Sequence, residues 1–207
     1  MISLSSTINT FIMTKFSKIA LCALVIGSSA FFTSCEDTEE TGPPVVKTLY
    51  TKVGGAVMVN DPNNPGQKIE QGRLSFRSVV DTTIVLIVSD IVADAPGNFG
   101  AHFAPLAAEV FGDNNATNVA VLSKNLTDIF SVASGGGATN TYSGMNMIDA
   151  HDPAKNSRMG KKVNDAEMTK FIGYVGQAAG KNGVTDPVII DEVVALLESL
   201  RAPIVQE

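Results

Sequence analysis

The chain has 207 residues, of which 44% are hydrophobic and 17% charged, and its formal net charge is −6. This apolar content excludes a wholly disordered chain, and the acidic balance argues against a nucleic-acid-binding protein, which needs a basic surface to meet phosphates. Both cysteines, Cys22 and Cys35, lie near the N-terminus, so the rest of the chain has none for a disulfide framework or a cysteine-ligated zinc site.

The first segment has the features of an export signal. Residues 19–32 form an apolar run that follows Lys15 and Lys18 and precedes small polar residues and Cys35. This order is typical of a bacterial secretory signal, and the run is shorter than the roughly 20 apolar residues of a spanning helix. The four residues ending at Cys35 resemble a lipobox, with phenylalanine instead of the usual leucine at the first position. We expect a signal peptide at 1–34 and lipidation of Cys35, with an uncleaved anchor helix as the alternative.

An acidic segment follows Cys35 and ends at Pro43 and Pro44. Such a segment cannot bury itself and is typical of a solvated tether. We therefore expect a lipidated tether at 35–47 and a folded domain at 48–207. The domain would be exported and held by its lipid at a membrane, on the periplasmic face or at the cell surface.

The first long apolar segment of the domain is 78–93. Its β-branched residues would suit a strand, but its length favours a buried helix, which Pro96-Gly97-Asn98 ends. Residues 117–133 carry apolar side chains at spacings of three and four, which predicts an amphipathic helix. The glycine triplet 135–137 ends that helix.

Two more helices are indicated by their caps. Asn164, with Glu167 three residues later, predicts a capping box and a helix that ends at Gly180 and Gly183. Asp186 and Pro187 then predict the cap and first turn of the last helix. Three further segments are expected to be loops: 60–72, 112–117 and 151–162.

Residues that could carry chemistry are few. The sequence has no Gly-x-Ser-x-Gly elbow and no phosphate-binding glycine loop, and its two histidines, His102 and His151, exclude a multi-histidine zinc site. Met147 lies four residues before His151, so the two share a face if this piece is helical. A lone histidine on an apolar face is commonly structural, but a neutral imidazole is also a frequent metal ligand, including of haem iron.

The residues before His151 resemble the region before the proximal histidine of group 1 truncated haemoglobins, with a glycine pair, a tyrosine, a glycine and then a methionine four residues before the histidine. The resemblance covers about residues 48–205, with gaps. Five further pieces agree in order: 49–55 with the N-terminal helix and its glycine pair, 79–90 with the second helix, Phe103 with a phenylalanine on the haem, 122–136 with the distal helix, and 191–201 with the last helix.

The resemblance implies an all-α fold, a truncated globin-like helical sandwich of two helices over two with loop insertions. It also implies a haem b cofactor whose iron is bound by His151. Met147 would pack near the haem on the same side, and Phe103 would contact the ring.

The resemblance implies a distal pocket faced by Leu122 and Leu126. Ile84 stands where the family commonly has a distal tyrosine, and Leu126 where a distal glutamine is common. Bound dioxygen is stabilised by hydrogen-bond donors. We therefore expect an all-aliphatic pocket that holds dioxygen loosely and discriminates less against carbon monoxide or nitric oxide.

Two insertions, 58–75 and about 104–118, have no counterpart in the family. His102 adjoins the second insertion and would be either an exposed loop residue, the simpler expectation, or a sixth ligand of the iron. A basic set could pair with haem propionates or form a solvated patch: Lys124, Arg158, Lys161 and Lys162.

Three functions follow from the resemblance. The first is reversible binding of oxygen, nitric oxide or carbon monoxide at a histidine-ligated haem iron. The second is a haem enzyme, a nitric oxide dioxygenase or peroxidase, which needs a reductant that the sequence does not identify. The third is a haem-free globin-fold lipoprotein for surface interactions.

Overall fold

The structure is a computed structural model that describes residues 46–111 and 115–207. The expected signal peptide, Cys35 and nearly all of the tether lie outside the described residues, so these expectations stay predictions. Within the described ranges, no helix combines the length and the apolar character needed to cross a membrane.

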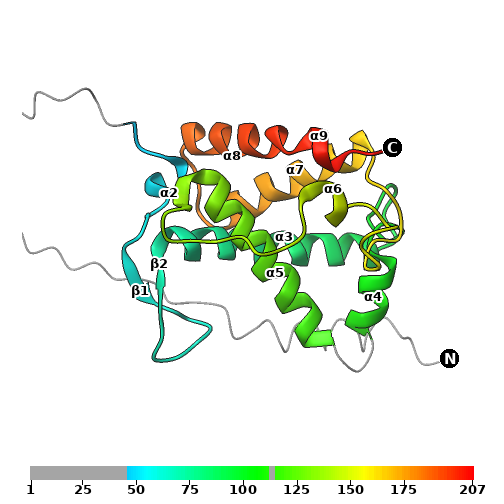
Figure 1. The fold of residues 1–207 in the computed structure, drawn as a ribbon, viewed down its shortest axis with the longest axis horizontal. Helices are drawn as coiled ribbons and strands as arrows, with labels where there is room; N and C mark the ends of the chain where they lie inside the picture. Colours follow the sequence, from blue (N-terminus) through cyan, green and yellow to red (C-terminus); the bar gives the residue numbers. More distant parts are fainter. Residues whose placement is uncertain (1–45, 112–114) are drawn as a thin grey trace, which may run out of the picture. The chain divides into compact units, whose positions relative to one another are not determined.

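The described domain is mainly helical, as expected, with one small hairpin (Figure 1). Helix α3 packs most extensively against α5 and α7, and α8 covers α7, so two helical layers enclose the core. The elements are α2 (Leu49–Lys52), β1 (Met58–Asn60), β2 (Lys68–Glu70), α3 (Gln71–Val92), α4 (Ala104–Phe111), α5 (Asn115–Ser131), the π-helical turn η1 (Val132–Gly136), α6 (Met147–Ala150), α7 (Asp165–Lys181), α8 (Pro187–Ser199) and α9 (Arg201–Ile204).

Helix α3 forms despite its many β-branched residues. Its buried positions, among them Phe76, Val80 and Ile84, recur every four residues and face the core, which is a helical period. The hydroxyls of Thr82 and Thr83 donate to carbonyls four residues back, so they are satisfied within the helix. The expected buried helix is confirmed, but it begins at residue 71 rather than 78.

The first insertion is not the irregular loop that was expected over 60–72. Strands β1 and β2 pair antiparallel, with Val59 opposite Ile69, and α3 follows directly. The buried carboxylate of Asp61 accepts hydrogen bonds from Arg77 of α3 at 2.6 and 3.1 Å. This ion pair ties the hairpin to the helix, a long-range contact that the turn-forming composition of the segment does not reveal.

The π-helical turn η1 continues α5 and ends at Gly136, within the glycine triplet that was expected to end the helix. Gly135 has φ +101°, which favours glycine, and a Cβ on Gly136 would lie 2.6 Å from the Ser131 carbonyl and 2.8 Å from the Tyr50 ring. These glycines therefore let α2 approach the end of α5. The helix begins at Asn115, inside the expected loop 112–117, of which 112–114 lie outside the described residues.

The caps of α7 and α8 are as predicted. The Asn164 side chain accepts from the Glu167 amide while the Glu167 carboxylate accepts from the Asn164 amide. Asp186 accepts from the Val188 amide ahead of Pro187. Much of the expected loop 151–162 is formed of turns, and most of the second insertion is helix α4 rather than loop.

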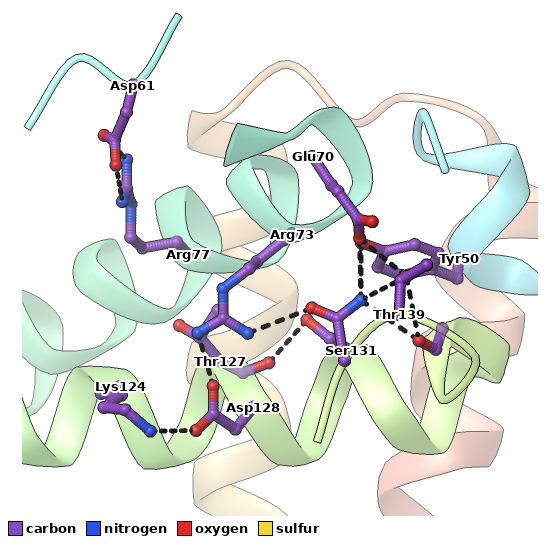
Figure 2. A network of polar contacts seen from close by, with 12 residues as sticks. Tyr50, Asp61, Glu70, Arg73, Arg77, Lys124, Thr127, Asp128, Ser131 and Thr139 are labelled. Carbon is purple, nitrogen blue, oxygen red and sulfur yellow. Dashed lines mark hydrogen bonds and ion pairs between the residues drawn. The ribbon is translucent and has the colours of Figure 1, made fainter. Parts of the chain in front are cut away.

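A polar network joins the elements that lead to α6 (Figure 2). The Asn140 amide donates to the Tyr50 hydroxyl at 3.0 Å and to Glu70 at 2.8 Å, and its oxygen accepts from Arg73. Arg73 also donates to the buried carboxylate of Asp128 on α5. Burial and the hydrogen bond to Glu70 raise the pKa of Tyr50 to about 12. The network fixes the start of the segment that connects η1 to α6.

Candidate functional site

A mostly apolar cavity of about 250 Å³ lies between α3, α5 and the segment that carries α6. Every residue that the sequence assigns to the cofactor site lines it. Whether these residues bind a cofactor stays a prediction, but the fold brings them to one place: Ile84, Phe103, Leu122, Leu126, Met147 and His151, together with His102.

His151 follows directly after α6. Asn146 caps this short helix by accepting from the Asp149 amide at 3.0 Å. The Nδ1 atom of His151 lies 2.9 Å from the Met147 carbonyl oxygen. Because a carbonyl only accepts, this bond places the proton on Nδ1 and leaves Nε2 as the nitrogen with a free lone pair. The piece before His151 is helical, as the expected pairing of Met147 with His151 needs, and His151 is the residue directly after its end.

His102 is buried, with 4% of its surface exposed. Its Nδ1 lies 3.1 Å from the Lys161 carbonyl oxygen, and its own carbonyl accepts from the Gly160 amide at 2.7 Å. The Phe103 ring meets the imidazole edge to face at 4.7 Å. The simpler expectation, an exposed loop histidine, is therefore wrong, because these backbone contacts pull the 100–103 turn against the segment before α7.

The two imidazoles are neighbours across the cavity. Their ring centroids are 6.4 Å apart and their planes differ by 19°. Burial, and secondly the neighbouring His151, lower the pKa of His102 to about 4, and burial lowers the pKa of His151. Both rings are therefore neutral near pH 7, the form in which an imidazole binds a metal.

The distal wall is less uniform than an all-aliphatic pocket. Ile84 and Leu126 supply no hydrogen-bond donor, as expected, but Asn125 of α5 also lines the cavity. Tyr142 lines it too, although its hydroxyl donates to the Met145 carbonyl. The sequence analysis missed Asn125. Its position next to Leu126 on an amphipathic helix could have indicated that it lines the cavity.

Two members of the expected basic set already have carboxylate partners. Lys124 pairs with Asp128 at 2.5 Å. Lys161 pairs with Glu167 at 3.1 Å and with Glu207 at 3.4 Å. These ion pairs compete with any anionic group of a ligand, so Lys124 and Lys161 are not held ready for one.

The helical sandwich and a histidine-lined apolar cavity define a globin-type fold. The chain resembles the crystal structure of a truncated hemoglobin from Tetrahymena pyriformis, a tyrosine-to-phenylalanine variant in its Fe(III) form. The match has a TM-score of 0.50 and 19% identity, and it covers 78% of this chain and 100% of that one. No family model and no curated protein matches the chain. The fold is thus that of a truncated globin.

Proposed function

We propose that this domain binds haem b, with His151 as the protein ligand of the iron, and that the haem reversibly binds oxygen, nitric oxide or carbon monoxide. The observation that carries the proposal is the imidazole of His151, anchored through Nδ1 to the Met147 carbonyl at the wall of an apolar cavity. A hydrogen bond of this kind fixes ring orientation and tautomer in metal-binding histidines. The globin fold provides the second support.

The residues present suit a flat, largely apolar group. Phe103, Leu122 and Met147 offer apolar contact, and the neutral imidazole offers a nitrogen ligand. The cavity of about 250 Å³ lies just below the roughly 300 Å³ at the lower end of small-molecule sites. Haem therefore fits only if lining side chains turn outward, and we expect binding to widen the cavity.

Ligand binding is favoured over oxygen chemistry by the two aliphatic residues at the expected distal positions, Ile84 and Leu126. Cleavage of an O–O bond depends on polar groups placed to assist it. Ile84 and Leu126 supply none, and Asn125 offers a neutral amide that can donate a hydrogen bond but cannot act as an acid near pH 7. A nitric oxide dioxygenase or peroxidase is the alternative and would need an external reductant.

We also propose that the domain is exported and held at a membrane by lipid on Cys35, through the tether 35–47. The support is the order of basic, apolar and small residues before Cys35. Incorporation of labelled palmitate into the parent but not into Cys35→Ser tests this proposal separately from haem binding.

Haem titration of the full-length chain in detergent tests the main proposal. We expect a Soret band that saturates at one haem per chain, and loss of tight binding in His151→Ala. Gln206→Ala serves as the matched control, because its side chain donates to the Ile148 carbonyl of α6 but does not line the cavity. A parent that binds no haem while melting cooperatively would instead favour the haem-free surface function.

A further inference from the structure

We propose that His102 is the second protein ligand of the haem iron, so that the resting site is closed by two histidines and an incoming ligand must displace His102. This inference rests on the proposed haem binding and specifies how that site is regulated. Three observations carry it: the spacing of the rings, the hydrogen bonds that use Nδ1 of each ring, and the backbone contacts that hold His102.

The ring spacing suits one metal ion between the two imidazoles. A metal–imidazole bond is about 2 Å long, and a ring centroid lies about 1 Å behind its nitrogen, so two such ligands on opposite sides of one ion have centroids roughly 6 Å apart. The observed separation of 6.4 Å agrees with this distance, and the two rings are nearly parallel, with 19° between their planes.

The hydrogen bonds leave the same nitrogen available on each ring. His102 and His151 both use Nδ1 to meet a backbone carbonyl, of Lys161 and Met147 respectively. Among the described residues, no hydrogen bond reaches either Nε2 atom. Two rings held in one tautomer, at one cavity, are prepared to bind a shared ion.

His102 is held in place by its contact with the segment before α7. The Gly160 amide donates to the His102 carbonyl at 2.7 Å. A Cβ on Gly160 would lie 2.1 Å from the Ala101 carbonyl oxygen, so only glycine permits this approach. The turn that carries His102 is therefore positioned by close backbone contact with Gly160 as well as by packing of the histidine side chain.

A second histidine ligand changes what the site does. With His102 bound, the iron would have no open position, and the observed affinity for a gas would equal the intrinsic affinity multiplied by the fraction of molecules in which His102 has dissociated. Turning the His102 imidazole away breaks its hydrogen bond to the Lys161 carbonyl, so ligand binding would be coupled to the loss of that contact. The site would thus sense a ligand through a conformational change.

Spectroscopy of the haem-loaded full-length chain tests the proposal. We expect the ferric parent to be low-spin and six-coordinate by optical and electron paramagnetic resonance spectra. His102→Ala should keep one haem per chain and lose the low-spin signal. Carbon monoxide should bind the ferrous parent at a rate that saturates with concentration, and His102→Ala at a rate that rises linearly.

The outcomes separate this inference from the proposed function. A parent that binds haem but is high-spin, or a His102→Ala variant that stays low-spin, overturns the role of His102 and leaves haem binding by His151 intact. A parent that takes up no haem overturns both.

Two glycine-to-alanine variants test whether the contact with Gly160 positions His102, and both variants keep the two imidazoles. Gly160→Ala should shift the ferric spectrum toward high spin, because the new methyl group pushes the His102 turn away. Gly173→Ala on α7 is the control, since its Cβ would meet nothing within 4 Å, and it should keep the parent spectrum. Equal spectra for the two variants would contradict the positioning argument.

Discussion

The Nδ1 atom of His151 lies 2.9 Å from the carbonyl oxygen of Met147, one helical turn earlier in the chain. The orientation of the imidazole therefore depends on the integrity of α6, a helix of four residues. So short a helix has little stability of its own, so its cap and its tertiary contacts decide how well the histidine is held.

Removing the cap of α6 should loosen haem without unfolding the domain. Asn146→Ala removes an N-cap worth about 1 kcal/mol. If all of that free energy weakens the attachment of haem through His151, haem should be lost up to about fivefold faster. Haem transfer to an excess of apomyoglobin measures the rate. Asp186→Ala, which removes the equivalent cap of α8, should lower the melting temperature without faster haem loss; if both variants lose haem alike, α6 has no special role.

A donor added to the distal wall should retain dioxygen. Leu126→Gln offers an amide toward the cavity, and one hydrogen bond of about 1 kcal/mol corresponds to roughly fivefold slower dissociation. Replacement of bound oxygen by carbon monoxide, followed in a stopped-flow instrument, gives the rate. Leu126→Met, which keeps the wall apolar, is the control and should stay near the parent rate.

The amide of Asn125 is a native polar group at the same cavity. Asn125→Leu should therefore speed oxygen dissociation, again by about fivefold for one lost hydrogen bond. Carbon monoxide, which carries less negative charge on its bound atom, should respond less. An unchanged oxygen dissociation rate would show that the amide does not reach the ligand.

The pair between Asp128 and Arg73 should contribute more stability than the pair between Asp128 and Lys124. The Asp128 side chain is 3% exposed, and Arg73 is far less exposed than Lys124. Arg73→Ala should cost about 3 kcal/mol, since it leaves the buried carboxylate of Asp128 without its less exposed partner. Lys124→Ala should cost under about 1 kcal/mol, as for an exposed pair. Urea denaturation of haem-free protein measures both, and equal losses would refute the ranking.

Acid should weaken the attachment of the hairpin to α3. Hydrogen bonds from Arg77 hold the pKa of Asp61 well below its usual range. A carboxyl whose folded pKa is depressed stabilises the fold above its unfolded pKa of about 3.9 and loses that contribution as the pH falls toward the folded value.

Asp61→Asn should therefore cost about 2 kcal/mol at pH 7 and progressively less below about pH 4. Denaturant unfolding at a series of pH values measures this. Asp165→Asn is the control, because that carboxylate is 76% exposed and its removal should leave the acid profile close to that of the parent. A constant difference between parent and Asp61→Asn across the pH range would contradict the assignment.

The sequence predicted helix ends well where they depend on contacts between residues close together in the chain. The capping box at Asn164 and the Asp186-Pro187 start describe contacts within three residues. The start of α3 was missed because the hairpin residues 58–70 have turn-forming composition, and their pairing depends on Asp61 meeting Arg77 sixteen residues later.

The candidate site divides in the same way. His151 stood out because histidine is scarce and Met147 precedes it by one turn, both of which are visible in the chain. The burial of His102 was not, because it depends on Gly160 and Lys161, which are nearly 60 residues away. Asn125 was overlooked because the neighbouring helices determine which residues of α5 face the cavity, and the sequence does not show their positions.

The sequence by itself therefore determined the principal helices, which follow from periodicity and caps, while the resemblance to truncated haemoglobins implied the globin fold and singled out His151. Only the tertiary structure decided that both histidines line one cavity at 6.4 Å. That relation comes from the approach of two irregular segments, 100–103 and 159–161, whose backbone hydrogen bonds join residues distant in the chain. Contacts of this kind have no period and no local signature, so they become visible only when the chain is folded.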